Sequence, residues 1–179
     1  MKSLQFILGS LMIMLFFSCD SNDDSPSDQV LFAVPVVKSF AEIRNDISVW
    51  SARTTNSDGK IYVSEKQLYY IAQEEGVHVY DNSNPAAPLN TAFINIGGVH
   101  DIAVKGDFLY ADNYMDLLVF NISDLQHITL VRTVENAITF YATFPETAQY
   151  YDYTVTAGTG EMITGFKLEY RERPNEQNV

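Results

Sequence analysis

Two stretches of the chain repeat one phrase forty residues apart. The first is GVHVYDNSNPAAPLN, from Gly76 to Asn90, and the second is DLLVFNISDLQHITL, from Asp116 to Leu130. Each opens with an apolar run and continues into a turn rich in Asp, Asn and Ser. An apolar run bounded by such turn residues is typical of a β-strand. The repetition predicts that the chain builds the same supersecondary unit twice.

The similarity extends over a whole unit, because residues 61–84 align with residues 101–124 without a gap. Identical or chemically similar pairs are Tyr70 with Tyr110, Val79 with Val119, Ser83 with Ser123, and Asp81 with Asn121. Asp81 and Asn121 follow an apolar run, where their side chains can accept a hydrogen bond from the backbone two residues on and so form the turn. The alignment predicts two units of about forty residues, 61–98 and 99–136.

Each unit divides into four short apolar segments separated by turn residues. The expected strands are 61–63, 68–72, 77–80 and 91–96 in the first unit, and 101–104, 108–111, 117–120 and 129–133 in the second. Four strands in about forty residues is the content of one propeller blade, with Gly97 and Gly98 as the joint between the two blades. A closed propeller needs about four blades or more, so two to three units predict an incomplete or short propeller.

These phrases resemble the LVIVD repeat, in which an apolar strand is followed by an Asx-Ser-Asp/Asn turn and proline. The first copy carries Pro85 and Pro88, whereas the second has Leu125 and Ile128. LVIVD proteins are propeller-like, often exported and mostly of undefined function. The resemblance therefore implies a fold and an exported location rather than an activity.

The segments that flank the two units complete a mainly β fold. Residues 30–37 favour a strand, and Ser39 with Glu42 has the spacing of a capping box, which predicts a short helix over 40–48. We therefore expect a strand and a short helix within residues 30–60, ahead of a β-repeat domain over 61–179. In its last part, segments 151–157 and 162–170 predict a hairpin within a degenerate third unit, 137–172.

Residues 1–18 have the pattern of a signal peptide, because Lys2 precedes an apolar run too short to span a bilayer. The following LFFSCD resembles the lipobox of bacterial lipoproteins, which implies that the thiol of Cys19 takes a diacylglycerol and that the protein carries palmitate or similar chains. Cys19 is the only cysteine, so no intramolecular disulfide competes for it. The alternative is an ordinary secreted protein in which this cysteine occurs by chance.

Residues 19–29 carry four Asp and no cation, which predicts an acidic flexible tether. The segment resembles the acidic stretch of lipoproteins that some Gram-negative bacteria export to the outer face of the outer membrane. This resemblance implies lipid anchoring in the outer membrane and exposure at the cell surface, with the leaflet left open. An Asp-x-Asn-x-Asp spacing here lacks the glycine and the distal Glu of a calcium loop, so a tether is the better interpretation.

The charge balance argues against a nucleic-acid partner. The formal net charge is −12, and loss of the signal peptide would remove one further cation, Lys2. A strongly acidic chain is repelled by nucleic acid and by anionic lipid. Contact with the membrane is therefore expected through the lipid anchor.

Residue patterns for catalysis or metal binding are weak. His78, His100 and His127 lack the spacing of a zinc-binding set, and GTGE at 158–161 lacks the third glycine and the context of a dinucleotide-binding loop. The expectation is a protein that is not an enzyme and that has no cofactor and no bound metal.

Tyrosines offer a binding site more readily. Tyr70, Tyr80 and Tyr110 fall on expected strands and are predicted to fill the blade cores. Tyr114 falls in an expected turn, where an exposed ring flanked by polar side chains would suit a glycan or a protein. The candidate binding residues are Asp112, Asn113, Tyr114 and Asp116. The alternative is that Tyr114 folds back on its own blade.

The leading hypothesis is a surface-anchored, non-enzymatic β-repeat lipoprotein that binds or scaffolds a macromolecular partner, either a protein or a glycan. The alternative is an accessory subunit or truncated remnant of a larger envelope enzyme or propeller protein. Open sheet edges would also allow self-association.

Overall fold

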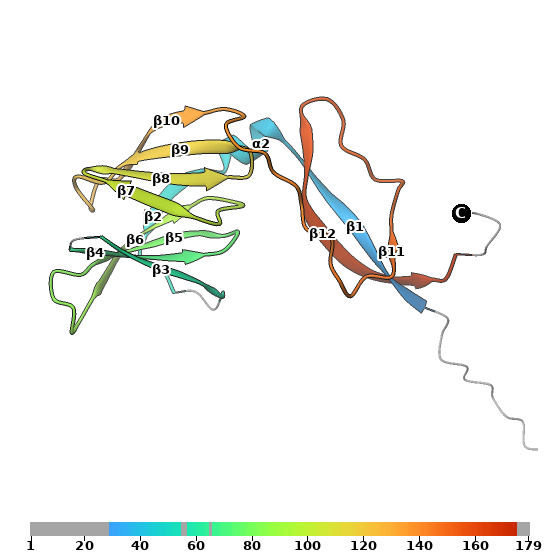
Figure 1. Cartoon of the computed structure of the whole chain (residues 1–179), viewed down its shortest axis with the longest axis horizontal. Helices are drawn as coiled ribbons and strands as arrows, with labels where there is room; N and C mark the ends of the chain where they lie inside the picture. The colour runs from blue at the N-terminus through green and yellow to red at the C-terminus, as the bar shows by residue number, and fades with distance from the viewer. Residues whose placement is uncertain (1–28, 55–56, 65, 175–179) are drawn as a thin grey trace, which may run out of the picture. The chain divides into compact units, whose positions relative to one another are not determined.

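The computed structural model describes residues 29–54, 57–64 and 66–174, whose strands form three open sheets (Figure 1). This confirms a mainly β fold with one short helix. Across these residues no helix has the length and apolar character needed to cross a membrane. The predicted signal peptide, Cys19 and nearly all of the tether lie outside the described residues.

The first repeat forms a five-stranded sheet of order β2-β6-β5-β4-β3. Its strands are β2 (Ser48–Ser51), β3 (Gly59–Ser64), β4 (Gln67–Ala72), β5 (Gly76–Asp81) and β6 (Leu89–Asn95). All four strands predicted for this unit are confirmed. The fifth, β2, pairs with β6 at the outer side of the sheet and was not predicted.

The second repeat forms a four-stranded sheet of order β10-β9-β8-β7. Its strands are β7 (Ile102–Lys105), β8 (Phe108–Asn113), β9 (Asp116–Asn121) and β10 (Thr129–Val134). In both repeats the second strand pairs antiparallel with the third, as expected. The turn chemistry is also confirmed, because Ser83 N donates to Asp81 Oδ1 at 2.8 Å and Ser123 N donates to Asn121 Oδ1 at 2.9 Å.

One core cluster draws on both repeat sheets. Its largest fully buried side chains are Tyr69, Phe120, Ile71, Ile94, Ile96, Leu109 and Leu118. The expectation that Tyr70, Tyr80 and Tyr110 fill this core is wrong, because each lies on the opposite face of its strand and is only half-buried. Phe108, two residues before Tyr110 on the same strand, is 40% exposed and also lies outside this core.

The core-facing positions of the two repeats are not related by one constant offset. On β4 and β8 they are forty residues apart, as Tyr69 and Leu109 show, whereas on β5 and β9 they are forty-one apart, as Val79 and Phe120 show. The ungapped alignment of the two repeats is therefore wrong on the third strand. Because side chains alternate across a strand, a slip of one residue moves a side chain to the other face.

The third sheet, of order β11-β1-β12, replaces the expected third unit. Its strands are β1 (Gln29–Ser39), β11 (Tyr150–Tyr151) and β12 (Glu161–Glu172). The hairpin predicted over 151–170 is wrong, because β11 pairs in parallel with β1, and β12 lies on the other side of β1. The apolar β1 thus supplies the pairing that a local hairpin would have supplied.

The predicted helix exists but is shorter than expected. The helix α2 spans Phe40–Asn45 and begins at a capping box: Glu42 N donates to Ser39 Oγ at 3.2 Å, and Ser39 N donates to the Glu42 carboxylate at 2.8 Å. Its Ile43 is buried in a second, smaller cluster with Tyr114 and Met115. The helix therefore packs against the loop in which the binding residues were predicted.

Candidate functional site

The predicted binding residues lie at the end of the β8–β9 hairpin. Asn113 pairs with Asp116, so only Tyr114 and Met115 form the loop. In the first repeat the corresponding loop has three residues, 73–75, and its hairpin lacks this additional pair. The additional pair lies on the inward-facing side, and Asn113 and Asp116 are both fully buried. This longer hairpin is the cause of the changed offset between the repeats.

The binding hypothesis required an exposed ring at Tyr114, and the structure favours the alternative, a ring that packs inward. Only 9% of Tyr114 is exposed, and its ring packs edge-on against Phe140 with 5.0 Å between ring centroids. Burial raises the pKa of its hydroxyl. Tyr114 also adopts a φ of 49°, a left-handed conformation that is uncommon for a bulky residue. The Tyr114 ring therefore packs the β8–β9 loop against the helix α2 and against Phe140, which lies in the segment after β10.

The joint between the repeats is shaped to receive this ring. Gly98 has a φ of +68°, and a Cβ atom on it would lie 2.4 Å from Tyr114 Cδ1. Gly106, in the β7–β8 turn, has a φ of +56°, but a Cβ atom there would meet nothing within 4 Å. Both positions therefore have a left-handed backbone that favours glycine. Only at Gly98 would a side chain also clash with a neighbouring residue.

Replacing Gly98 with alanine should therefore destabilise the protein more than replacing Gly106 with alanine. Both variants strain a left-handed backbone, but only Gly98→Ala forces the ring of Tyr114 to move. We expect the difference in unfolding free energy to be about 1–3 kcal/mol, the usual cost of overpacking, as measured by urea denaturation. Equal losses in the two variants would show that Tyr114 does not pack on the joint.

Asp116 is held by an ion pair with the helix. Arg44 Nε lies 2.6 Å from Asp116 Oδ2, Arg44 Nη2 donates to Oδ1 at 3.1 Å, and Asn136 N donates to Oδ1 at 2.9 Å. Burial tends to raise the pKa of this carboxyl, but the hydrogen bonds from Arg44 and Asn136 outweigh it and lower the pKa. Asp116 therefore fixes α2 to the second repeat and is not accessible to a ligand.

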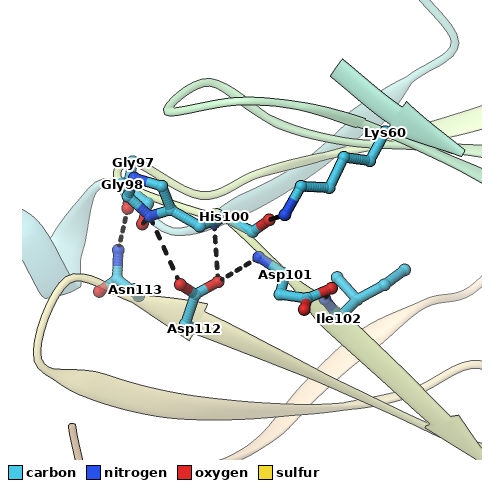
Figure 2. Close-up of polar contacts among 8 residues, drawn as sticks. All are labelled: Lys60, Gly97, Gly98, His100, Asp101, Ile102, Asp112 and Asn113. Atoms are coloured by element: carbon cyan, nitrogen blue, oxygen red, sulfur yellow. Dashed lines mark hydrogen bonds and ion pairs between the residues drawn. The ribbon is translucent and has the colours of Figure 1, made fainter. Parts of the chain in front are cut away.

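Asp112 and Asn113 organise the joint (Figure 2). Asp112 Oδ1 accepts hydrogen bonds from His100 N at 2.8 Å and from Asp101 N at 2.9 Å. Asn113 Nδ2 donates to the carbonyl of Gly97 at 2.5 Å. These contacts tie β8 to the segment that links the two sheets. The four predicted residues are thus brought together, and each makes internal contacts.

An exposed apolar pair on β3 was missed by the sequence analysis. Ile61 and Val63 are 66% and 56% exposed, and they lie two residues apart on one face of the strand. Within the described residues, β3 is the last strand of its sheet and pairs only with β4. The alternation of apolar residues at 61 and 63 was visible in the sequence, but the position of the strand at a sheet edge was not.

The titratable side chains outside this region are dispersed. His127 pairs with Asp124 on the surface, at 2.7 Å between Nδ1 and Oδ2. In the described part of the chain, no three His, Cys, Asp or Glu side chains are placed to hold a metal ion.

Comparison with curated proteins and with solved structures finds no match to this chain. The family model of the LVIVD repeat matches two adjacent segments. The first covers β3, β4, β5 and the start of β6, and the second covers β7 to β10. LVIVD repeats are thus detected at residues 59–91 and 96–136, and they supply β3 to β5 of the first sheet and all four strands of the second, whereas β2 and most of β6 lie outside the matched segments.

Proposed function

We propose that this protein is a lipid-anchored protein of the cell surface that binds a polypeptide partner along the open edge of its first LVIVD sheet. It acts by binding rather than by catalysis. The observation that carries this proposal is the exposed apolar pair Ile61 and Val63 on the edge strand β3.

An edge strand of this kind is suited to strand addition. In an antiparallel pair every second residue directs its N–H and C=O groups away from the partner strand, so β3 offers alternate backbone groups to another chain. Proteins commonly protect such an edge with lysine. Lys60 is engaged elsewhere, because its Nζ donates to the carbonyl of His100 at 3.2 Å. The β3 edge therefore combines backbone groups directed away from β4 with the exposed aliphatic side chains of Ile61 and Val63.

These features favour a polypeptide over a glycan as the partner. An extended peptide can add backbone hydrogen bonds to β3 and place its own side chains against Ile61 and Val63. A glycan site at Tyr114 would need an exposed aromatic ring, and that ring is buried. The chain's net charge of −12 further favours a basic partner.

Lysine at position 61 should weaken partner binding, whereas lysine at position 89 should not. Leu89 is 65% exposed, which matches Ile61 at 66%, so the two variants add the same charge at equally exposed aliphatic sites. Lysine at the edge both removes the apolar contact and opposes strand addition. After cross-linking in intact cells, the wild type and Leu89→Lys should retain a polypeptide that Ile61→Lys loses. Equal retention by both variants would exclude the β3 edge.

The anchoring part of the proposal rests on LFFSCD and on the acidic tether, at residues outside those described. Replacing Cys19 with alanine should abolish the incorporation of labelled palmitate and release the protein from membranes.

The surface exposure of the protein is tested separately. In the wild type, protease added to intact cells should remove the protein. Membrane association without an acyl label would contradict the lipid anchor, and protection until the outer membrane is broken would contradict surface exposure.

A second candidate function follows from the open architecture. The described residues form two repeat sheets, whereas a closed propeller has about four or more. Phe108 lies partly exposed on the outward face of the second sheet. If the protein is an accessory subunit of a larger propeller protein, the cross-linked polypeptide should itself carry LVIVD repeats. If it is a surface receptor, the polypeptide should carry none.

A further inference from the structure

A small cavity lies beside the joint between the repeats and is separate from the β3 edge. Its volume is about 220 Å³. Its lining includes Glu74, His100, Phe140, Tyr141, Thr143 and Thr164. They come from the β4–β5 loop, the joint, the segment after β10, and β12. Drug-sized ligands occupy pockets of about 300–1,000 Å³, so this cavity suits one small functional group.

His100 presents an acceptor to this cavity. Its Nδ1 lies 2.9 Å from the carbonyl oxygen of Gly98 and 3.5 Å from Asp112 Oδ2. Figure 2 draws these residues. Both partners can only accept, so Nδ1 carries the proton. In a neutral imidazole the other nitrogen, Nε2, is then an acceptor. The joint therefore sets the tautomer of His100 and leaves its acceptor nitrogen for a ligand.

Glu74 supplies a negative charge at the same site. Its backbone is fixed to the joint, because Glu74 N donates to Val99 O at 3.0 Å and its carbonyl accepts from Gly98 N at 3.2 Å. The side chain is exposed, and in the described part of the chain no cation pairs with its carboxylate. Among the described residues that line the cavity, none is Lys or Arg. The fixed backbone thus holds an unneutralised carboxylate at the cavity.

Two aromatic residues that line the cavity also favour a cation as its ligand. Phe140 and Tyr141 contribute aromatic rings, and Tyr141 is 84% exposed. A cation near an aromatic face is attracted by the negative face of the ring. We propose that this cavity binds an organic cation, a guanidinium or primary ammonium group, that donates hydrogen bonds to Glu74 and to His100 Nε2 and lies against the aromatic rings. The source is either a free amine or a basic side chain of a polypeptide.

The test compares two probes that differ in charge and little in shape. The probes are the Nα-acetylated amides of arginine and citrulline, called arginine amide and citrulline amide below; the first carries a guanidinium group as its only cation, and the second carries a neutral urea in its place. The wild-type chain without its signal peptide should bind arginine amide at least tenfold more tightly than citrulline amide, as measured by NMR titration. Equal binding of the two probes, or no binding of either, would overturn the proposal. A short N-acetylated peptide with one arginine between glycines separates the sources, because tighter binding of the peptide points to a polypeptide side chain and tighter binding of arginine amide to a free small-molecule cation.

Matched variants locate the site. Glu74→Gln should weaken arginine amide binding at least tenfold, and Tyr141→Leu should weaken it several-fold. The control is Asp107→Asn, which removes the same charge at the exposed β7–β8 turn outside the cavity and should leave binding within about twofold. Equal weakening by Glu74→Gln and Asp107→Asn would overturn the proposal in favour of bulk charge. The proposal does not depend on the β3 edge, since neither Ile61 nor Val63 lines the cavity.

Discussion

Replacing Phe120 with alanine should lower the free energy of unfolding by about 3–5 kcal/mol, the range for large-to-small changes of a buried aromatic ring. Phe120 is fully buried, and it faces Leu109 across the β8–β9 pair in the core that draws on both repeat sheets. Single domains have unfolding free energies of about 5–15 kcal/mol. The variant should therefore unfold at a much lower urea concentration than the wild type.

The matched control is Phe108→Ala on the neighbouring strand. The same ring is removed, but Phe108 is on the outward face and is 40% exposed, so the loss should be less than half that of Phe120→Ala. The comparison also tests the offset between the repeats. If the ungapped alignment held on the third strand, Phe120 would face outward like Tyr80, and the two variants would lose similar stability.

The second large effect is expected at Arg44. Arg44→Ala leaves the fully buried Asp116 without its partner, and an uncompensated buried charge typically costs about 3–5 kcal/mol. Glu135 pairs with the same guanidinium at 3.0 Å, but its side chain is 60% exposed. Glu135→Ala should therefore cost no more than about 1 kcal/mol, as is usual for an exposed pair. Similar losses in the two variants would contradict the structural role of Asp116.

The same pair predicts a pH dependence. The pKa of Asp116 is lowered in the folded state, so its contribution to stability is fully present above the unfolded pKa of about 3.9. It is lost as the pH falls through the lower, folded pKa. Urea denaturation should show the stability gap between the wild type and Arg44→Ala narrowing on acidification. A constant gap between pH 7 and pH 2 would contradict the ion pair.

The strands of the repeats were predictable because their signals are local. Apolar runs bounded by Asx turns fix β3 to β10 within a few residues, and the side chains of Asp81 and Asn121 act as their positions in the turn imply. The helix start was predictable for the same reason, since Ser39 and Glu42 form a capping box. Its end was not, because Ile47 continues the helical spacing while β2 begins at Ser48.

The features that could not be predicted from the sequence depend on contacts between residues that are far apart in the chain. Tyr114 was expected in solvent because its neighbours are polar, yet Asp116 is paired with Arg44, 72 residues away. In place of the expected hairpin of residues 151–170, β11 and β12 both pair with β1, which lies more than 100 residues earlier in the chain. For the candidate site, Asp112 to Asp116 lie at the end of one hairpin, as their adjacency in the sequence requires. The edge position of β3 depends on the order of strands in the sheet, which no local pattern reveals.

The proposed partner edge is tested most directly by site-specific photo-cross-linking in intact cells. A benzophenone amino acid placed at position 61 should form an adduct with an extended segment of a partner polypeptide, and the same residue at position 89, of equal exposure, should form none. Adducts of equal yield from both positions, or an adduct at position 61 with a second copy of this chain alone, would contradict a partner-binding edge at β3.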